Sequence, residues 1–147
     1  MATLALNKKA GFDYDFLTKM EGGLVLTGAE VKAARSGHVQ LKGAYLSTAN
    51  GELYLKNAFI AKYAPAGEQG EYDPYRDRKV LVNAKELAVI REKNSTDGLT
   101  IVPISVYTKG NFIKLGFAIA RGKKKFEKRD AIKKRDVDRA IRQHLKD

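Results

Sequence analysis

The dipeptide Asn50-Gly51 lies between two β-prone runs and fixes the course of the middle of the chain. Both residues tolerate the positive φ angles of a type I′ turn, so AYLSTANGELYLKNAFIAKY predicts a tight antiparallel hairpin. We expect strands around residues 40–48, 52–57 and 58–63. This part of the chain is therefore a series of short strands joined by turns.

Two short helices are predicted beside these strands, each from a capping signal. Thr27 and Glu30 have the spacing of a capping box directly after the strand-like run GLVLT, and this helix should stop near Gly37. Asn83, with Glu86 three residues later, marks the start of a second helix through AKELAVIREK.

Further strands are predicted in the second half of the chain. Residues 64–77 contain two prolines, two glycines and several charges without an apolar period, which predicts a long surface loop. RKVLV and LTIVPISVY resume strand character, and Pro103 indicates that the second of these is an edge strand or bulged. Residues 112–120 form a half-buried strand with apolar period two at Ile113, Leu115, Phe117 and Ile119.

Many short strands with two interposed helices favour a mainly β fold. We predict a partly open, oligonucleotide-binding-like small barrel with helices covering its gaps. The length of 147 residues and the hydrophobic content of 44% suit one compact domain. The chain has no cysteine, which fits a reducing compartment, and its apolar runs are far shorter than the ~20 residues that span a bilayer. We expect a cytoplasmic protein without a membrane partner.

The charge is concentrated at the C-terminal end. The chain carries a net charge of +11, which favours polyanionic partners. Residues 121–147 hold 12 basic and 5 acidic residues, a net charge of +7. Their helical apolar stripe is sparse, and isolated helices of this length are marginal. We therefore predict a barrel over residues 1–120 and a basic tail over 121–147 that is disordered when free and helical when bound.

Catalytic groups are scarce in this sequence. It has two histidines, His38 and His144, no cysteine, and none of the common nucleophile, metal-protease or Walker motifs. Its acidic residues have basic neighbours in the sequence, which favours ion pairing over acid catalysis. We predict a protein that is not an enzyme and needs no cofactor or metal.

Four separated segments carry a more specific pattern: LNKKAGFDYDF, EGGLVLTGAEVKAARSG, YDPYRDRKVLVN and ARGKKKFEKRDAIKKRD. In this order they resemble the signature blocks of the bacterial tmRNA-binding family, small protein B, of trans-translation. The resemblance runs nearly end to end. It implies that the barrel binds the tRNA-like domain of tmRNA in a 1:1 complex. It also implies that the tail enters the vacant decoding centre and mRNA channel of a stalled ribosome, against ribosomal RNA.

The same resemblance and the chemistry of the side chains indicate which residues are candidates for RNA binding. Asn7, Glu21 and Leu81 fall where the family has tmRNA-facing residues, although they could instead be a turn residue, a solvated charge and core. Basic side chains can contact phosphates. The predicted RNA-binding residues are Asn7, Lys8, Lys9, Glu21, Lys32, Arg35, Arg76, Arg78, Lys79 and Leu81. The predicted decoding-centre residues are Gly122, Lys123, Lys124, Phe126, Glu127, Lys128 and Arg129.

Some positions depart from the family pattern. Ala33-Ala34 replace the usual serine and larger aliphatic residue, while Phe126 and Glu127 replace the usual tyrosine or histidine and aspartate. Phe126 can still stack on a base, or it could pack onto the barrel as core. The alternative to the whole interpretation is a generic barrel-type ribosomal or initiation-factor-like RNA binder, in which the tail only neutralises ribosomal RNA charge.

Overall fold

The computed structural model describes residues 2–63 and 72–123. Its helices are α1 (Ala10–Asp13), α2 (Gly28–Arg35) and α3 (Ala84–Asn94). Its strands are β1 (Thr3–Leu6), β2 (Tyr14–Leu24), β3 (Val39–Gln40), β4 (Tyr45–Ala49), β5 (Glu52–Lys56), β6 (Phe59–Ile60), β7 (Arg78–Leu81), β8 (Leu99–Lys109) and β9 (Phe112–Gly122).

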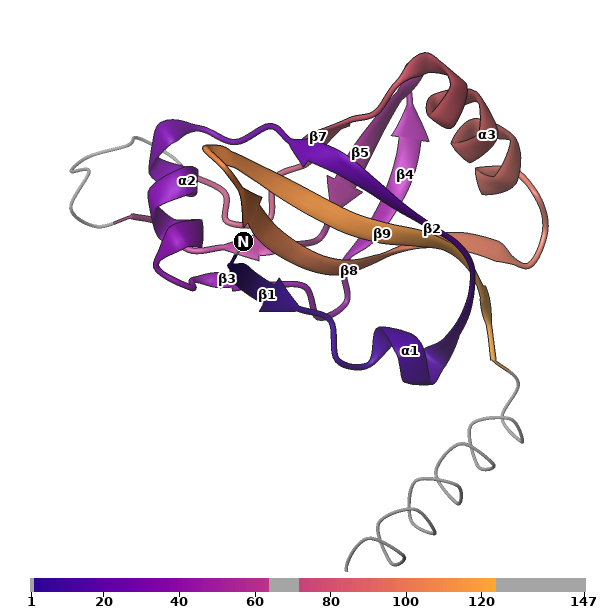
Figure 1. Cartoon of the computed structure of the whole chain (residues 1–147), viewed down its shortest axis with the longest axis horizontal. Coiled ribbons are helices and arrows are strands. Elements are labelled where there is room, and N and C mark those ends of the chain that lie inside the picture. Colours follow the sequence, from indigo (N-terminus) through magenta and orange to yellow (C-terminus); the bar gives the residue numbers. More distant parts are fainter. Residues whose placement is uncertain (1, 64–71, 124–147) are drawn as a thin grey trace, which may run out of the picture.

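Antiparallel strands close into a ring. The order β8-β4-β5-β7-β2-β9 returns to β8 through the β8–β9 pairing, and β1 adds to the other side of β8 (Figure 1). β4 and β8 share only the pair Leu46↔Ile101, and α3 packs against both strands at this weak joint. The small barrel flanked by helices is therefore confirmed, with a ring that is closed where we predicted a partly open one.

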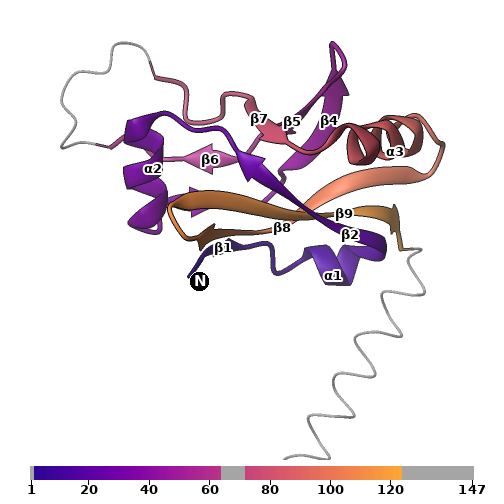
Figure 2. The ribbon, with the colours of Figure 1, turned by 45° about the horizontal axis from the view of Figure 1, so that its top comes forward.

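Apolar side chains fill the barrel. Alternate residues of β9 point inward as predicted, and Leu115 and Phe117 are fully buried in the main core. Residues of the opposite parity, Val102 on β8 and Ala118 on β9, are buried as well, because α1 packs against β8 there. The turned view shows α1 alongside these strands (Figure 2). The N-terminal segment thus covers part of the outer face of the barrel.

Most local predictions hold. Asn50 and Gly51 have φ angles of 52° and 76°, and the capping box of Thr27 and Glu30 is formed. The Asn83 side chain accepts a hydrogen bond from the Glu86 backbone N–H. β8 is bulged next to Pro103.

Some boundaries differ from prediction. The strand expected over 40–48 is split into β3 and β4, because Gly43 turns the chain with a φ of 76°. β2 is longer than the strand-like run that marked it, and α1 and β1 were not predicted. β9 continues to Gly122, beyond the predicted domain boundary at residue 120. Within the described residues, no helix is long and apolar enough to cross a membrane.

Candidate nucleic-acid interface

Glu21 lies in the second half of β2 on the outer face of the barrel, where its side chain is exposed. It is paired with Gly116 of β9, which in turn is paired with Ser105 of β8. The Tyr107 hydroxyl donates a hydrogen bond to the Glu21 carboxylate. A Cβ at Gly116 would lie 3.5 Å from the Tyr107 ring and 3.3 Å from the Ser105 hydroxyl. The Tyr107 ring thus reaches across β9 at Gly116, where even a methyl group would touch it and would crowd the Ser105 hydroxyl.

The environment of Glu21 keeps it ionised. The hydrogen bond from Tyr107 holds the pKa of Glu21 below its usual range, and the ammonium groups of Lys109 and Lys114 act in the same direction. Lys109 Nζ lies 3.4 Å from Glu21 Oε1. Burial and the neighbouring carboxylate raise the pKa of Tyr107, so its hydroxyl remains a donor. Glu21 is thus an oriented carboxylate acceptor, suited to a base amine or a 2′-hydroxyl.

Replacing Tyr107 with phenylalanine is expected to raise the pKa of Glu21 toward its ordinary value, because the largest interaction that lowers it is lost. An NMR pH titration of the Glu21 carboxyl group measures this directly. Tyr54→Phe is the matched control, since the Tyr54 hydroxyl contacts Glu52 rather than Glu21. An unchanged Glu21 pKa in Tyr107→Phe would show that Tyr107 does not hold this carboxylate.

Leu81 belongs to the same outer face. It pairs with Gly23 of β2, two residues from Glu21, and its side chain remains 54% exposed. The alternative that Leu81 is plain core is therefore wrong. A groove of about 350 Å³ runs beside it, lined in part by Phe112 and Lys114. Phe112 is 69% exposed, which adds a second apolar group to this surface.

Lys79 also points outward, because it is two residues from Leu81 on β7. Its Nζ lies 2.8 Å from Glu52 Oε1, and this contact raises the pKa of Lys79 and lowers that of Glu52. Lys32 and Arg35 are exposed on α2, and this helix packs against β6. They therefore do not lie on the strands that hold Glu21. Lys32 Nζ lies 5.7 Å from the centre of the Tyr63 ring. The structure thus groups Glu21, Lys79 and Leu81, whereas α2 contributes Val31, but neither Lys32 nor Arg35, to the groove beside Leu81.

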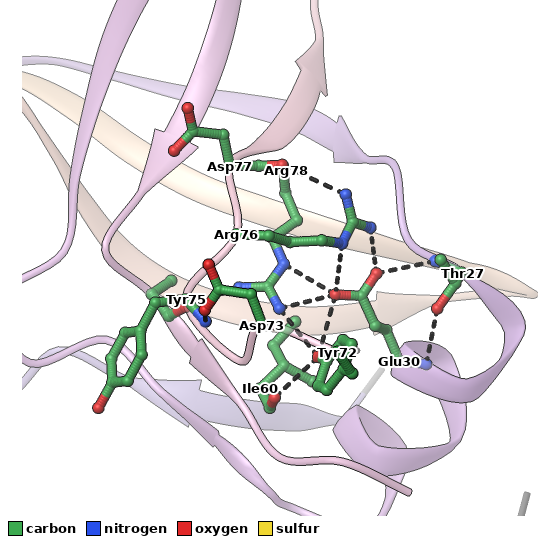
Figure 3. Close-up of polar contacts among 10 residues, drawn as sticks. Thr27, Glu30, Ile60, Tyr72, Asp73, Tyr75, Arg76, Asp77 and Arg78 are labelled. Atoms are coloured by element: carbon green, nitrogen blue, oxygen red, sulfur yellow. Dashed lines mark hydrogen bonds and ion pairs between the residues drawn. The ribbon is translucent and has the colours of Figure 1, made fainter. Parts of the chain in front are cut away.

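The position of Arg78 does not suit its predicted role in RNA binding. Its side chain is fully buried, and it contacts Glu30 Oε2 through Nε at 2.9 Å and Nη2 at 2.7 Å (Figure 3). Its Nη1 donates to the Ala58 carbonyl at 2.6 Å. The cause is strand parity: β7 pairs with β5, so Arg78 shares the inward face with Leu55. Burial excludes Arg78 from direct RNA contact in this conformation.

Arg76 also forms an ion pair with Glu30, although part of its side chain is exposed. Both Nε, at 3.1 Å, and Nη2 of Arg76 bond to the Glu30 carboxylate. The Tyr72 hydroxyl donates to the Ile60 carbonyl at 2.8 Å and accepts from Arg78 Nη2 at 3.0 Å. Figure 3 shows these groups converging on the first turn of α2. The arginines therefore tie the segment before β7 to α2.

Glu30 is the centre of this cluster, and the sequence indicated it only as a capping residue. Its side chain is 1% exposed. Burial alone would raise its pKa, but hydrogen bonds from Arg76, the Thr27 backbone and Arg78 outweigh burial and lower it to about 2. The Glu30 carboxylate is thus charged, buried and fully paired, which is the arrangement that a buried ion needs.

The pKa of Glu30 predicts an acid-sensitive fold. In the unfolded chain Glu30 takes up a proton near its ordinary pKa of 4.5, whereas the folded protein resists protonation down to about pH 2. Its contribution, on the order of 3 kcal/mol, is therefore complete above pH 4.5 and lost as the pH falls toward 2. Denaturant unfolding measured between pH 2 and 6 tests this. Glu30→Gln should lose stability less steeply over that window, and a parallel pH profile would contradict the assignment.

The N-terminal candidates lie along β8. The Asn7 Nδ2 donates to the Pro103 carbonyl at 2.9 Å, and its backbone N–H donates to the Ile104 carbonyl at 2.8 Å. Asn7 thus anchors the chain at the bulge of β8, and its own carbonyl accepts from the Ala10 N–H in a turn. Lys8 and Lys9 are exposed on this turn.

Two of the decoding-centre candidates belong to the folded domain. Gly122 pairs with Tyr14, and Lys123 bonds through its backbone N–H to the Asp13 carbonyl at 2.9 Å. Lys123 Nζ also donates to the Gly11 carbonyl at 3.0 Å. The start of the predicted tail is therefore fixed beside α1. The remaining candidates lie outside the described residues: Lys124, Phe126, Glu127, Lys128 and Arg129.

Comparisons with known proteins converge on one family. A family model described as SmpB protein matches residues 4–147. A protein of Sulfurihydrogenibium sp. named SsrA-binding protein is 46% identical over 143 residues, covering 97% of this chain and 93% of that protein. One of the same name from Latilactobacillus sakei is 41% identical, covering 97% and 91%. A solved structure described as "tmRNA-SmpB: a journey to the center of the bacterial ribosome" is 40% identical, with a TM-score of 0.65, covering 82% of this chain and 84% of that one.

Proposed function

Because this chain belongs to the SmpB protein family, we propose that it is an RNA-binding adaptor of trans-translation. Its barrel binds the tRNA-like domain of tmRNA and delivers the RNA to stalled ribosomes. The observation that carries this proposal is the match to the family over residues 4–147, together with the likeness to a structure described as tmRNA-SmpB in the bacterial ribosome. The alternative, a generic ribosomal RNA binder, has no comparable support.

The RNA-binding surface is the outer face around Glu21 and Leu81. Glu21 accepts hydrogen bonds from a base amine or a 2′-hydroxyl. The hydrogen bond that it receives from the Tyr107 hydroxyl keeps the carboxylate oriented. Leu81 and Phe112 offer apolar contact to a base, and Lys114 offers charge to the phosphates beside it. Arg78 has no direct part in this surface, and Arg76 acts mainly by holding the segment before β7 in place.

The tail performs a separate task. We propose that the basic tail, predicted over residues 121–147, acts mainly through residues 124–147, which are helical when bound in the vacant decoding centre and mRNA channel. Its basic residues bring it to ribosomal RNA, since phosphate contacts carry no sequence information. Phe126 supplies a flat ring that can stack on an unpaired base. The hydrogen bonds of Lys123 to α1 fix the point from which the tail departs.

This adaptor acts without catalysis, in the cytoplasm. Its role is to position an RNA, which requires complementary surface and charge rather than reactive groups. The residues grouped around Glu21 are an acceptor, apolar side chains and ammonium groups, and these suit binding. The tmRNA and the stalled ribosome, with its ribosomal RNA, are the partners.

Direct binding to RNA tests the proposal. The purified full-length protein should bind the tRNA-like domain of tmRNA at least about 100-fold more tightly than a paired RNA hairpin of equal length at the same salt concentration. Glu21→Ala should weaken this binding by about tenfold or more, whereas Glu92→Ala, an exposed carboxylate on α3, should not. Equal affinity for both RNAs would instead favour the generic RNA binder.

A further inference from the structure

A pocket of about 560 Å³ lies on the outer surface, between the N-terminal segment, the turn before β4, and β8. Three of its lining residues are buried and apolar, namely Ala10, Ala44 and Val102. Tyr45 also lines it and is 46% exposed. The volume suits a group the size of one nucleotide. An apolar floor with an aromatic wall is the environment in which an unpaired base stacks.

Both walls of this pocket are held by hydrogen bonds. On one side Asn7 clamps the N-terminal segment to the bulge of β8. On the other side the Asn57 Nδ2 donates to the Gly43 carbonyl at 3.1 Å, and the Ala44 N–H donates to the Leu41 carbonyl at 2.9 Å. The pocket is therefore formed before any ligand arrives, which lowers the entropy cost of binding.

The charge around the pocket suits a phosphate. Lys8, Lys9 and Lys42 line it and are exposed. Among the described residues none of these three takes part in an ion pair, in contrast to Lys79 and Lys109, which contact carboxylates. Asp13 is the acidic residue in the lining, so the cationic groups outnumber it. These ammonium groups remain available to an anionic ligand.

The pocket lies within a short distance of the surface around Glu21. Leu6 lines it and pairs with Ser105, which pairs with Gly116, which pairs with Glu21. Three strand spacings of about 4.8 Å therefore separate Leu6 from Glu21, roughly 14 Å in all. One RNA molecule can reach both places.

We propose that this pocket holds one unpaired nucleotide of the same RNA that the Glu21 face binds. The base stacks against Tyr45 over the apolar floor, and Lys8, Lys9 and Lys42 contact its phosphates. This inference rests on the proposed function, because it takes tmRNA as the RNA. It gives Lys42 and Tyr45 a role in RNA binding that the resemblance did not assign.

Two substitutions test the pocket against matched controls. Tyr45→Ala should weaken binding to the tRNA-like domain by about tenfold, through lost stacking, whereas Tyr45→Phe should stay within about twofold. Lys42→Ala should reduce the slope of log K against log salt by about one, whereas Lys85→Ala on α3 should leave it unchanged. Because Tyr45 and Lys42 are exposed, thermal unfolding should confirm that each variant is folded.

The outcomes separate this inference from the function on which it rests. Failure of the unsubstituted protein to prefer the tRNA-like domain would overturn the proposed function itself. Normal binding by that protein and equally tight binding by Tyr45→Ala and Lys42→Ala would overturn the pocket alone. The same variants are then measured on ribosomes without tmRNA. If these variants lose affinity only for the ribosome, the pocket is occupied by ribosomal RNA instead of tmRNA. That result would also overturn the inference.

Discussion

Replacing Glu30 with alanine is expected to lower the free energy of unfolding by about 3–5 kcal/mol, because it leaves a buried guanidinium without its counter-ion. Arg78 is 0% exposed and has two nitrogens on the Glu30 carboxylate. Arg76 and the Thr27 cap lose the same partner. Urea unfolding followed by circular dichroism measures the change. A loss of this size is a large part of the stability of a small domain.

The control is a carboxylate of similar chemistry on the surface. Glu52 pairs with Lys79, but both side chains are substantially exposed. Glu52→Ala should therefore change the free energy of unfolding by only about 0–1 kcal/mol. Equal losses in the two variants would mean that the buried cluster is not what holds α2 to the segment before β7.

Removing residues 124–147 is expected to abolish peptide tagging of stalled ribosomes while leaving affinity for the tRNA-like domain within about threefold. The proposed RNA-binding groups all precede β9's last residue, and Gly122 and Lys123 are themselves held against β2 and α1. Phe126→Ala should reproduce part of the defect, by roughly tenfold, if its ring stacks on a base. Tagging in a reconstituted translation system on an mRNA without a stop codon provides the measurement.

Two results would contradict this division of labour. A truncated protein that tags normally would show that the tail is not needed for decoding-site recognition. A truncated protein that loses affinity for the tRNA-like domain would place RNA-binding groups in the tail. For Phe126→Ala, a large fall in melting temperature would instead place the ring in the core.

Short-range signals in the sequence predicted the parts of the fold that neighbouring residues determine. Asn50-Gly51 adopts the positive φ angles of its turn, and Thr27 and Asn83 cap their helices. β2 was predicted only at its end, because its first residues mix charged and apolar side chains without a clear alternation. It forms because β9, about 100 residues away in sequence, pairs along almost its whole length.

The side of the sheet on which a residue lies determines whether it can bind RNA, and the sequence alone did not always show that side. DRKVLV places Arg78 and Lys79 side by side, and nothing local shows which of them faces inward. Pairing with β5 sets that register and turns Arg78 toward Glu30. A double Arg76→Ala, Arg78→Ala variant would therefore report on folding rather than on phosphate contacts. Tyr107 was missed for a similar reason, because only the pairing of β8, β9 and β2 brings it to Glu21.

Sequencing the RNA that co-purifies with the tagged full-length protein from its own cells shows whether this protein binds tmRNA in preference to other RNAs. We expect one dominant structured RNA, tmRNA, enriched far above its share of total RNA. Glu21→Ala should lower that enrichment, whereas the exposed control Glu92→Ala should not. Recovery of ribosomal RNA alone, in its cellular proportions and equally with all three proteins, would contradict the proposed function.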